Sequence, residues 1–525
     1  MRSLASIVSL TLSVGCHGTF DDGPMTAPRA NPPPRQLSCD VAEETGAPVP
    51  LRRLTAAQLQ ASVSDVFGVS VEFEVADEEL IGYRSNTTGS VNLPIARAFL
   101  DSAEAAAEEV SSTIASECTE QPTSHCADYV LDFFGRRLLR RSPSPEVRQR
   151  YRALFEDGTA QGDRRQGVQL VLEALLQSPY FLYQVESVDA DGWLDGPSVA
   201  SRLALALWGT VPDHAMLDAA ESGELSTAEG IRHWTEYAMN DPRFHHGLEV
   251  FVLQWLELER LNEANERPDL AAQEAATREA LQREPLTFFV QHLLQGSTVA
   301  DLLSSSETSN EPALRSVYGS DILESTDGVV QLDPSRRVGI LTLPGVQAAL
   351  AHANSTAPSL RGRAILANLL CRPPPPPPPD VVPSLPPPVP GASVRQQLEA
   401  HFSEPSCAAC HATMDGIGFA FEHYDWLGRF RSYDRHHRID ASGEFHLGAD
   451  QVRVLDAVDL SYELSERVDV SECISRQFAR YVLGVLETRE AACTIRDMGE
   501  AARRAGGLRE MVIELFVSEW FRRPG

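Results

Sequence analysis

Residues 55–68 read TAAQLQASVSDVFG, and this stretch decides the fold class because it carries the main signals of an amphipathic helix. Thr55 is a good N-cap, and Gln58 three residues later completes a capping box. The apolar side chains that follow at helical spacing are Leu59, Val63, Val66 and Phe67. Gly68 then stands where a C-terminal cap belongs. The stretch therefore predicts a helix with defined ends.

Helical patterns of this kind continue along most of the chain. We expect helices over residues 91–117, 129–139, 167–186, 198–208, 213–220, 244–261, 277–294 and 361–370. Strand signals are few, and the best is residues 438–455 with a turn at Ser442-Gly443. The sequence predicts a mainly α fold, with several helical domains in series and minor β structure.

A run of seven prolines, Pro373 to Pro379, interrupts the helical patterns. Such a run forms a polyproline II helix, and at about 3.1 Å per residue it spans roughly 22 Å. It predicts a stiff spacer after the helical body. A docking ligand for a proline-binding module is the alternative.

The chain has 525 residues, which is too long for a single hydrophobic core. We expect a lipoprotein signal peptide (1–16), a flexible tether (17–48), an N-terminal helical domain (49–116) and two further helical domains (117–190 and 191–335). After them we expect a helical segment with the proline spacer (336–392), a c-type haem segment (393–450) and a C-terminal helical domain (451–525).

The chain is strongly acidic, with 45 Lys and Arg against 74 Asp and Glu and a formal charge of −29. This balance argues against nucleic acid as a partner, because a phosphate backbone requires a basic footprint. A solvated acidic surface that favours solubility is the simplest interpretation, and steering of a cationic partner is the alternative.

The N-terminus has the pattern of a targeting segment. Arg2 precedes a short apolar run, Leu4 to Leu12, and Ser13-Val14-Gly15 leads directly into Cys16. This resembles a bacterial lipobox, which implies cleavage before Cys16 and lipidation of its sulfur. We expect an exported protein on the periplasmic or cell-surface side, anchored by lipid as an outer-membrane lipoprotein. Plain secretion is the alternative.

Six of the nine cysteines form an even set that predicts disulfides in an exported chain. Pairing between near neighbours joins Cys118 to Cys126 and Cys473 to Cys493. Cys39 is then left with Cys371. The six cysteines permit 15 connectivities, and buried free thiols are the alternative.

The motif Cys407-Ala408-Ala409-Cys410-His411 carries the chemistry. Two thiols at this spacing match the two vinyl groups of protohaem, and the adjacent His binds the iron. C-x-x-C-H therefore predicts one covalent haem c. A zinc site would need further paired ligands, a thioredoxin-like site would need a βαβ context, and a plain disulfide would not call for His411.

The sixth iron ligand is predicted to be His401, which lies close before the motif and is able to fold over the ring. Met414 lies one turn after His411, on the same side of the haem, so it should not reach the far face. The remaining candidates are His423, His436, His437, His446, Met498 and Met511.

Residues 401–431, from His401 through CAACH and Met414-Asp415-Gly416-Ile417-Gly418 to Arg431, resemble the haem segment of a family of secreted planctomycete- and myxobacterial-type cytochromes. That family is built from successive domains of unknown function. Further matching stretches are LRRLTAAQLQASVSDVFG at 51–68, RRLLRRSPS at 136–144, LLQSPYFLYQVE at 175–186, SRLALALWGTVPDHAMLDAA at 201–220, DPRFHHGLEVFVLQWLEL at 241–258 and RVGILTLPG at 337–345. Gly416 stands where the family usually has proline. The resemblance implies architecture and haem, and names no reaction.

Electron transfer is the predicted function, coupled to oxidation of an unknown substrate, with a redox protein or respiratory-chain component as partner. A haem enzyme of oxidase or peroxidase type is one alternative, with Glu422 and Asp425 as its acid/base candidates. Solvated helix charge or capping is the structural role expected of these two carboxylates. A scaffold that binds a polymer or protein, with a redox haem, is the other alternative.

Overall fold

The computed structural model describes residues 51–523 with gaps at 81, 88–90, 119–121, 263–266, 327, 376–389, 402–404 and 489–490, and at residues 80, 123, 124, 400, 401 and 405–410 it describes the backbone alone. The fold is mainly α-helical, as predicted, with several small sheets. The helices in this part of the chain are all too short or too polar to cross a membrane. The predicted signal peptide and tether lie outside the described residues, as does the proline spacer from residue 376 to residue 389.

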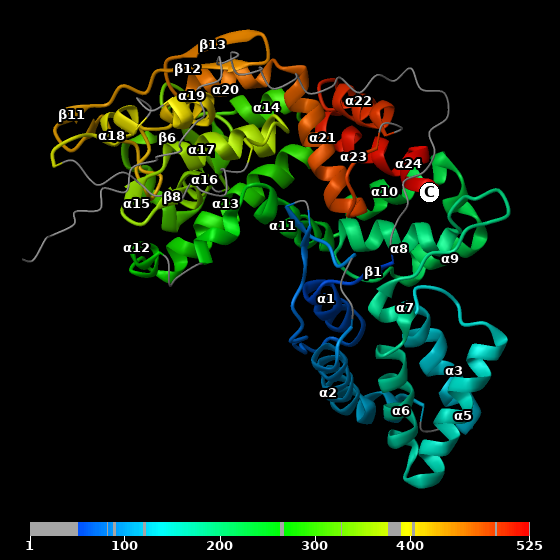
Figure 1. Ribbon diagram of the computed structural model, residues 1–525. Coiled ribbons are helices and arrows are strands. Elements are labelled where there is room, and N and C mark those ends of the chain that lie inside the picture. The colour runs from blue at the N-terminus through cyan, green and yellow to red at the C-terminus, as the bar shows by residue number, and fades with distance from the viewer. Residues whose placement is uncertain are drawn as a thin grey trace, which may run out of the picture.

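A first hydrophobic core forms the lower lobe in Figure 1. Its elements are α1 (Ala56–Phe67), α2 (Leu93–Glu117), α3 (Thr123–Tyr129), the π-helix η1 (Val130–Gly135), α4 (Arg136–Leu138), α5 (Pro145–Gln161), α6 (Arg164–Leu176) and α7 (Pro179–Leu182). The predicted capping box of α1 is confirmed, because Thr55 and Gln58 bond each other's backbone amides at 3.1 and 3.2 Å. Gly68 ends α1 with φ +72°, in the left-handed region that favours glycine.

A second, larger core contains the rest of the chain. Its first helices are α8 (Gly196–Leu207), α9 (His214–Ser222), α10 (Ala228–Met239), α11 (Arg243–Trp255), α12 (Pro268–Ala271), α13 (Ala275–Leu294), α14 (Val299–Ser304) and α15 (Arg315–Tyr318). The later ones are α16 (Pro344–Ala349), α17 (Pro358–Ala364), the π-helix η7 (Ile365–Leu369), α18 (Val394–His401), α19 (Pro405–Phe419), α20 (Ala457–Ser465), α21 (Val468–Leu483), α22 (Ala492–Ala501), α23 (Gly507–Val517) and α24 (Glu519–Arg522).

The C-terminal helices return to the start of the second core, beside α8 and α10 (Figure 1). The predicted buried helix at 198–208 is α8, in which every side chain except that of Pro197 is buried. The predicted domain limits stay predictions, and the packing places the segments on both sides of residue 116 in one core.

The strands are short and antiparallel. They are β1 (Arg52–Arg53) with β4 (Tyr183–Gln184), β2 (Glu79–Leu80) with β3 (Tyr83–Arg84), β5 (Glu307–Ser309), β7 (Val329–Leu332) and β6 (Ile322–Ser325) in one sheet, β8 (Ala351–His352) with β9 (Ser355–Thr356), β10 (Tyr433–Asp434) with β11 (His437–Arg438), and β12 (Gly443–Leu447) with β13 (Asp450–Val454).

The predicted strands within 438–455 are present, but the predicted position of the turn, at Ser442-Gly443, is wrong. The β12–β13 hairpin pairs Leu447 with Asp450, so the turn lies at Gly448, where φ is +70°. Gly443 instead begins β12, because it faces the backbone of α19, where an added Cβ would lie 2.0 Å from the carbonyl oxygen of Gly416. Close packing against α19, and not a turn, therefore explains why a glycine is needed at position 443.

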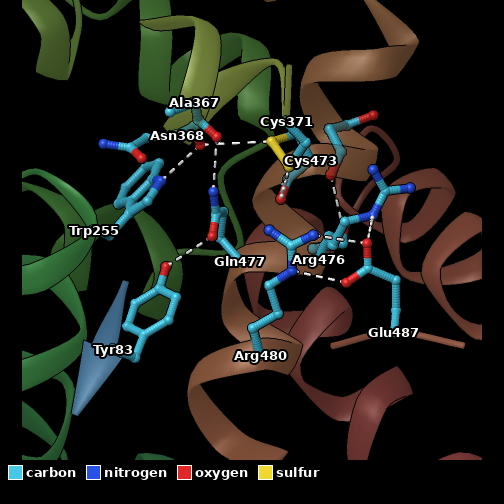
Figure 2. Close-up of a disulfide and its surroundings, with 12 residues drawn as sticks. Tyr83, Trp255, Ala367, Asn368, Cys371, Cys473, Arg476, Gln477, Arg480 and Glu487 are labelled. Carbon is cyan, nitrogen blue, oxygen red and sulfur yellow. Dashed lines mark hydrogen bonds and ion pairs between the residues drawn. A yellow bond between two sulfur atoms is a disulfide. The ribbon is translucent and has the colours of Figure 1, made fainter. Parts of the chain in front are cut away.

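Two disulfides lie in the described part of the chain. The predicted Cys118–Cys126 bond is confirmed. The predicted Cys473–Cys493 and Cys39–Cys371 bonds are wrong, because Cys371 bonds Cys473 across 102 residues (Figure 2). Cys493 is also disulfide-bonded, and Cys39 lies outside the described residues.

Helix packing explains the long-range disulfide. Cys371 follows η7, and α21 packs directly against η7. The Gln477 side-chain amide, one turn after Cys473, donates to the carbonyl oxygen of Ala367 at 3.0 Å, which fixes the same contact (Figure 2). Nearness in sequence is therefore a poor guide to pairing here, because a helix-helix contact brings distant cysteines together.

Glu284 in α13 is a buried carboxyl group whose protonation affects stability. Its Oε1 accepts from the hydroxyl groups of Tyr318 at 2.6 Å and Thr308 at 3.0 Å. Burial raises the pKa of Glu284 from its ordinary value of 4.5 to about 7. The folded state thus binds the proton more tightly than the unfolded state, so this stabilisation is full below pH 4.5 and is lost as the pH rises through about 7.

We expect the melting temperature of the wild type to fall between about pH 5 and about pH 8 more steeply than that of Glu284→Gln, because the amide does not ionise. Scanning calorimetry across this pH range measures the difference. Glu324→Gln, at an exposed glutamate of β6, is the matched control and should follow the wild type. Parallel pH profiles for wild type and Glu284→Gln would contradict the assignment.

Candidate functional site

The C-x-x-C-H motif lies in the first turns of α19, which begins at Pro405. Residues three or four apart on a helix share a face, so the helix places Cys407, Cys410 and His411 along one side of the backbone. The side chains of both cysteines lie outside what the structure describes, so their predicted thioether bonds stay predictions. The segment is helical, as the haem interpretation requires.

The imidazole of His411 is held by a carboxylate on its own helix. Its Nδ1 lies 3.1 Å from Oδ2 of Asp415, one turn further along α19. Asp415 is fully buried, and its Oδ1 has no hydrogen-bond partner in the described structure. A buried carboxylate is costly unless a donor or a positive charge compensates it. Asp415 was not among the predicted site residues, although its spacing of four from His411 is the signal that predicts such a pair.

Close helix packing fixes the position of α19. An added Cβ at Gly418 would lie 1.9 Å from the carbonyl oxygen of Pro358, and one at Gly362 would lie 1.6 Å from that of Met414. These glycines therefore allow α17 and α19 to approach backbone to backbone. Figure 1 shows α19 between α17 and the β12–β13 hairpin.

The other face of α19 packs on β12 through Gly416. An added Cβ at Gly416 would lie 2.4 Å from the carbonyl oxygen of Glu444. The family to which the segment is similar usually has proline here, and a proline ring would meet the same atom. The departure from the family pattern thus has a packing reason in this chain, because β12 lies directly against the helix.

The two acid/base candidates take part in structural networks. Glu422 is buried and contacts two guanidinium groups, Arg431 at 3.3 Å and Arg361 at 3.9 Å. Burial raises the pKa of Glu422 despite these charges. Asp425 caps its loop, accepting from the backbone amides of Leu427 at 2.8 Å and Arg429 at 2.9 Å. The expected capping role fits Asp425, whereas Glu422 is not solvated.

Arg361 of α17 joins this network to the loop after α19. It is 1% exposed and donates to the carbonyl oxygens of Phe421 at 2.9 Å and Tyr424 at 3.1 Å. Desolvation lowers the pKa of Arg361 to about 10, which leaves it charged at neutral pH. The carboxyl group of Glu422 lies 3.9 Å from this guanidinium inside the second core.

The candidates for the sixth ligand occupy different surroundings. His401 ends α18, and its side chain lies outside the described structure. His423 places Nδ1 2.8 Å from the carbonyl oxygen of Arg431, and Nε2 of His437 lies 2.9 Å from that of Gly391.

Four other candidates have packing or surface positions. His436 and His446 are exposed. Met498 and Met511 are fully buried in the second core, which gives both methionines a packing role. Met414, which the sequence analysis set aside, is half-buried and packs against the same core. The predicted ligand, His401, stays a prediction.

No group of three metal-binding side chains occurs among the residues whose side chains are described. Cys407 and Cys410 are not among these residues, so the absence concerns only sites elsewhere in the two cores.

Comparison with protein families finds three successive matches. Three family models, each described as a protein of unknown function, match the chain. They are PSD5 (DUF1595) at residues 126–186, PSD4 (DUF1592) at residues 194–320 and PSCyt3 (DUF1588) at residues 337–434. Three domains of unknown function therefore lie in series in this chain. They are domains associated with planctomycete cytochromes c, and the predicted series of domains is confirmed. No curated protein and no solved structure matches the chain.

The third match extends across the whole candidate site. Residues 337–434 include α17, the C-x-x-C-H turn of α19 and the Glu422 network. The packing glycines and the histidine that Asp415 holds thus belong to one domain.

We expect Gly418→Ala to destabilise the protein by about 1–3 kcal/mol, although alanine favours helices, because the methyl group overpacks the contact with Pro358. Thermal denaturation followed by circular dichroism measures the loss. Ala412→Ser, at an exposed position of the same helix, is the control and should melt as the wild type does. A Gly418→Ala protein as stable as the wild type would show that α19 is not held by this contact.

Proposed function

We propose that the chain is an exported c-type cytochrome that carries one covalent haem on α19. Cys407 and Cys410 are the attachment sites and His411 is the iron ligand. The observation that carries the proposal is the His411–Asp415 contact of 3.1 Å on the helix that bears both cysteines. Histidines that bind metals usually have their other ring nitrogen held by a carboxylate or carbonyl group.

The residues present fit a haem. Each cysteine thiol would add across one vinyl group of the haem, so that the S–H bond and the π bond of C=C are replaced by one C–S bond and one C–H bond. Asp415 holds Nδ1 of His411 and so assigns Nε2 to the iron. Bound haem supplies one-electron redox chemistry. The glycine contacts of α19 keep the ligand and both attachment points on a rigid element.

Electron transfer is the role that these contacts support best. Glu422 is paired with arginines and Asp425 caps a loop, so neither carboxylate has the open position that a general acid or base requires. We propose His401 as the sixth ligand, with His436 and His437 as the next candidates. A redox protein or a respiratory-chain component is the proposed partner.

Export and lipid anchoring through Cys16 complete the proposal. Two disulfides in the described structure, Cys118–Cys126 and Cys371–Cys473, support an oxidising compartment. Haem c is attached in the same kind of compartment. The lipid anchor would keep an acidic protein at a membrane surface that its charge does not favour.

Haem should remain with the wild-type polypeptide through acid-acetone extraction, because thioether bonds survive a treatment that breaks iron coordination. Expression in cells with a c-type maturation system and visible spectra of both phases measure this. Cys407→Ala and Cys410→Ala should each reduce attachment, whereas Ala412→Ser should not. Complete release of haem from the wild type would contradict covalent attachment.

Asp415→Asn should raise the reduction potential of the haem, on the order of tens of millivolts. In the wild type the negative charge of Asp415 stabilises the oxidised iron more than the reduced iron, and the variant loses this effect. Spectroelectrochemical titration measures the shift. Asp425→Asn, in a loop outside the helix, is the control and should leave the potential close to that of the wild type. An unchanged or lower potential in Asp415→Asn would refute the proposed role of Asp415.

A further inference from the structure

A small cavity lies where the two cores meet. Residues of α1, β1, β3, β4, α8, α11 and α21 line it, and its volume is about 30 Å³. A space of roughly 10–15 Å³ holds one water-sized group, so this cavity holds about two such groups. Its position between the first core and the C-terminal helices differs from that of α19 and the candidate haem site.

Arg52 of β1 supplies a buried positive charge to this cavity. The residue is 8% exposed, and its Nη1 donates to the carbonyl oxygen of Val482 at 2.9 Å. Within the described part of the chain this is its one side-chain hydrogen bond, and no carboxylate forms an ion pair with it. Desolvation lowers the pKa of Arg52 to about 10, so it remains charged at neutral pH.

The neighbouring carboxylates bind other arginines, although the charge of Glu186 partly offsets the effect of desolvation on the pKa of Arg52. Glu186 binds Arg202 through both oxygens, at 2.5 and 2.7 Å. At the rim, Arg84 pairs with Glu259 at 2.8 Å. Each of the other two arginines that line the cavity thus has its own carboxylate, and one positive charge is left over. A buried charge that forms no ion pair is unfavourable, and a bound anion would compensate it.

We propose that this cavity binds the carboxylate group of a small organic acid, with the Arg52 guanidinium as its bidentate donor. A guanidinium presents parallel N–H groups that match two carboxylate oxygens. Leu205, Ala206, Val250 and Val482 line the same space. Because the free volume takes only the carboxylate group, the organic body of the acid would lie toward the side of the cavity that is open to solvent. The amide side chains of Gln58 and Gln184 add polar groups.

The fit favours a carboxylate over an inorganic anion. The free space accommodates about two water-sized groups, which matches two carboxylate oxygens and not the four oxygens of phosphate. Chloride would use the charge of Arg52 but neither the fork geometry nor the apolar wall. The site is independent of the haem, because none of its lining residues belongs to α17, α19 or β12.

Sodium propionate is the probe, and sodium chloride and sodium phosphate at equal ionic strength are the comparison anions. We expect propionate to raise the melting temperature of the full-length protein at pH 7 and to bind with measurable heat in calorimetry. Arg52→Gln should weaken this binding about tenfold or more, because two charge-assisted hydrogen bonds are lost. Arg97→Gln removes an exposed arginine of α2 that does not line the cavity, and this control should bind propionate as the wild type does.

Arg52→Lys separates geometry from charge and covers the case in which Arg52→Gln does not fold. It keeps a cation near Val482 but lacks the fork, so it should fold as judged by circular dichroism and bind propionate at least several-fold more weakly. Absence of propionate binding to the wild type would overturn the proposal, as would equal binding by Arg52→Lys. Equal effects of chloride, phosphate and propionate would show general anion binding and would also overturn it.

Discussion

The packing of α19 against α17 and β12 is the constraint on which the candidate site depends. Three glycines, Gly362, Gly416 and Gly418, bring backbones together where any side chain would collide with a carbonyl oxygen. A helix held in this way has little freedom to shift along its axis or to rotate. The turn that carries Cys407, Cys410 and His411 therefore has a fixed direction with respect to the second core.

The buried charges follow from the same packing. Because α17 lies against α19, Arg361 reaches the loop that follows α19 and bonds its carbonyl oxygens, and Glu422 lies 3.9 Å from its guanidinium group. Asp415 is also buried, and it holds His411. Desolvation makes each of these groups dependent on its partner. The site is thus a charged network inside a helical scaffold, and the carboxylates that sequence alone offered for catalysis maintain that scaffold.

Local signals predicted the local structure well. Thr55, Gln58 and Gly68 gave the limits of α1, because capping depends on residues within one turn. Such local signals do not predict contacts between segments that are distant in the sequence. The disulfide from Cys371 to Cys473 depends on η7 lying against α21, and the use of Gly443 in β12 depends on the backbone of α19. The motif identified the helix that bears the site, but the burial of Asp415 and Glu422 required the packed structure.

The central claim is that α19 carries one haem on Cys407 and Cys410, and the mass of a single peptide tests it most directly. Trypsin cleaves after Arg395 and Arg429, and residues 396–429 contain both cysteines and no other lysine or arginine. Digestion of reduced, unfolded protein from cells with a c-type maturation system should yield this peptide with the added mass of one haem. The unmodified peptide alone, with two free thiols, would contradict the account.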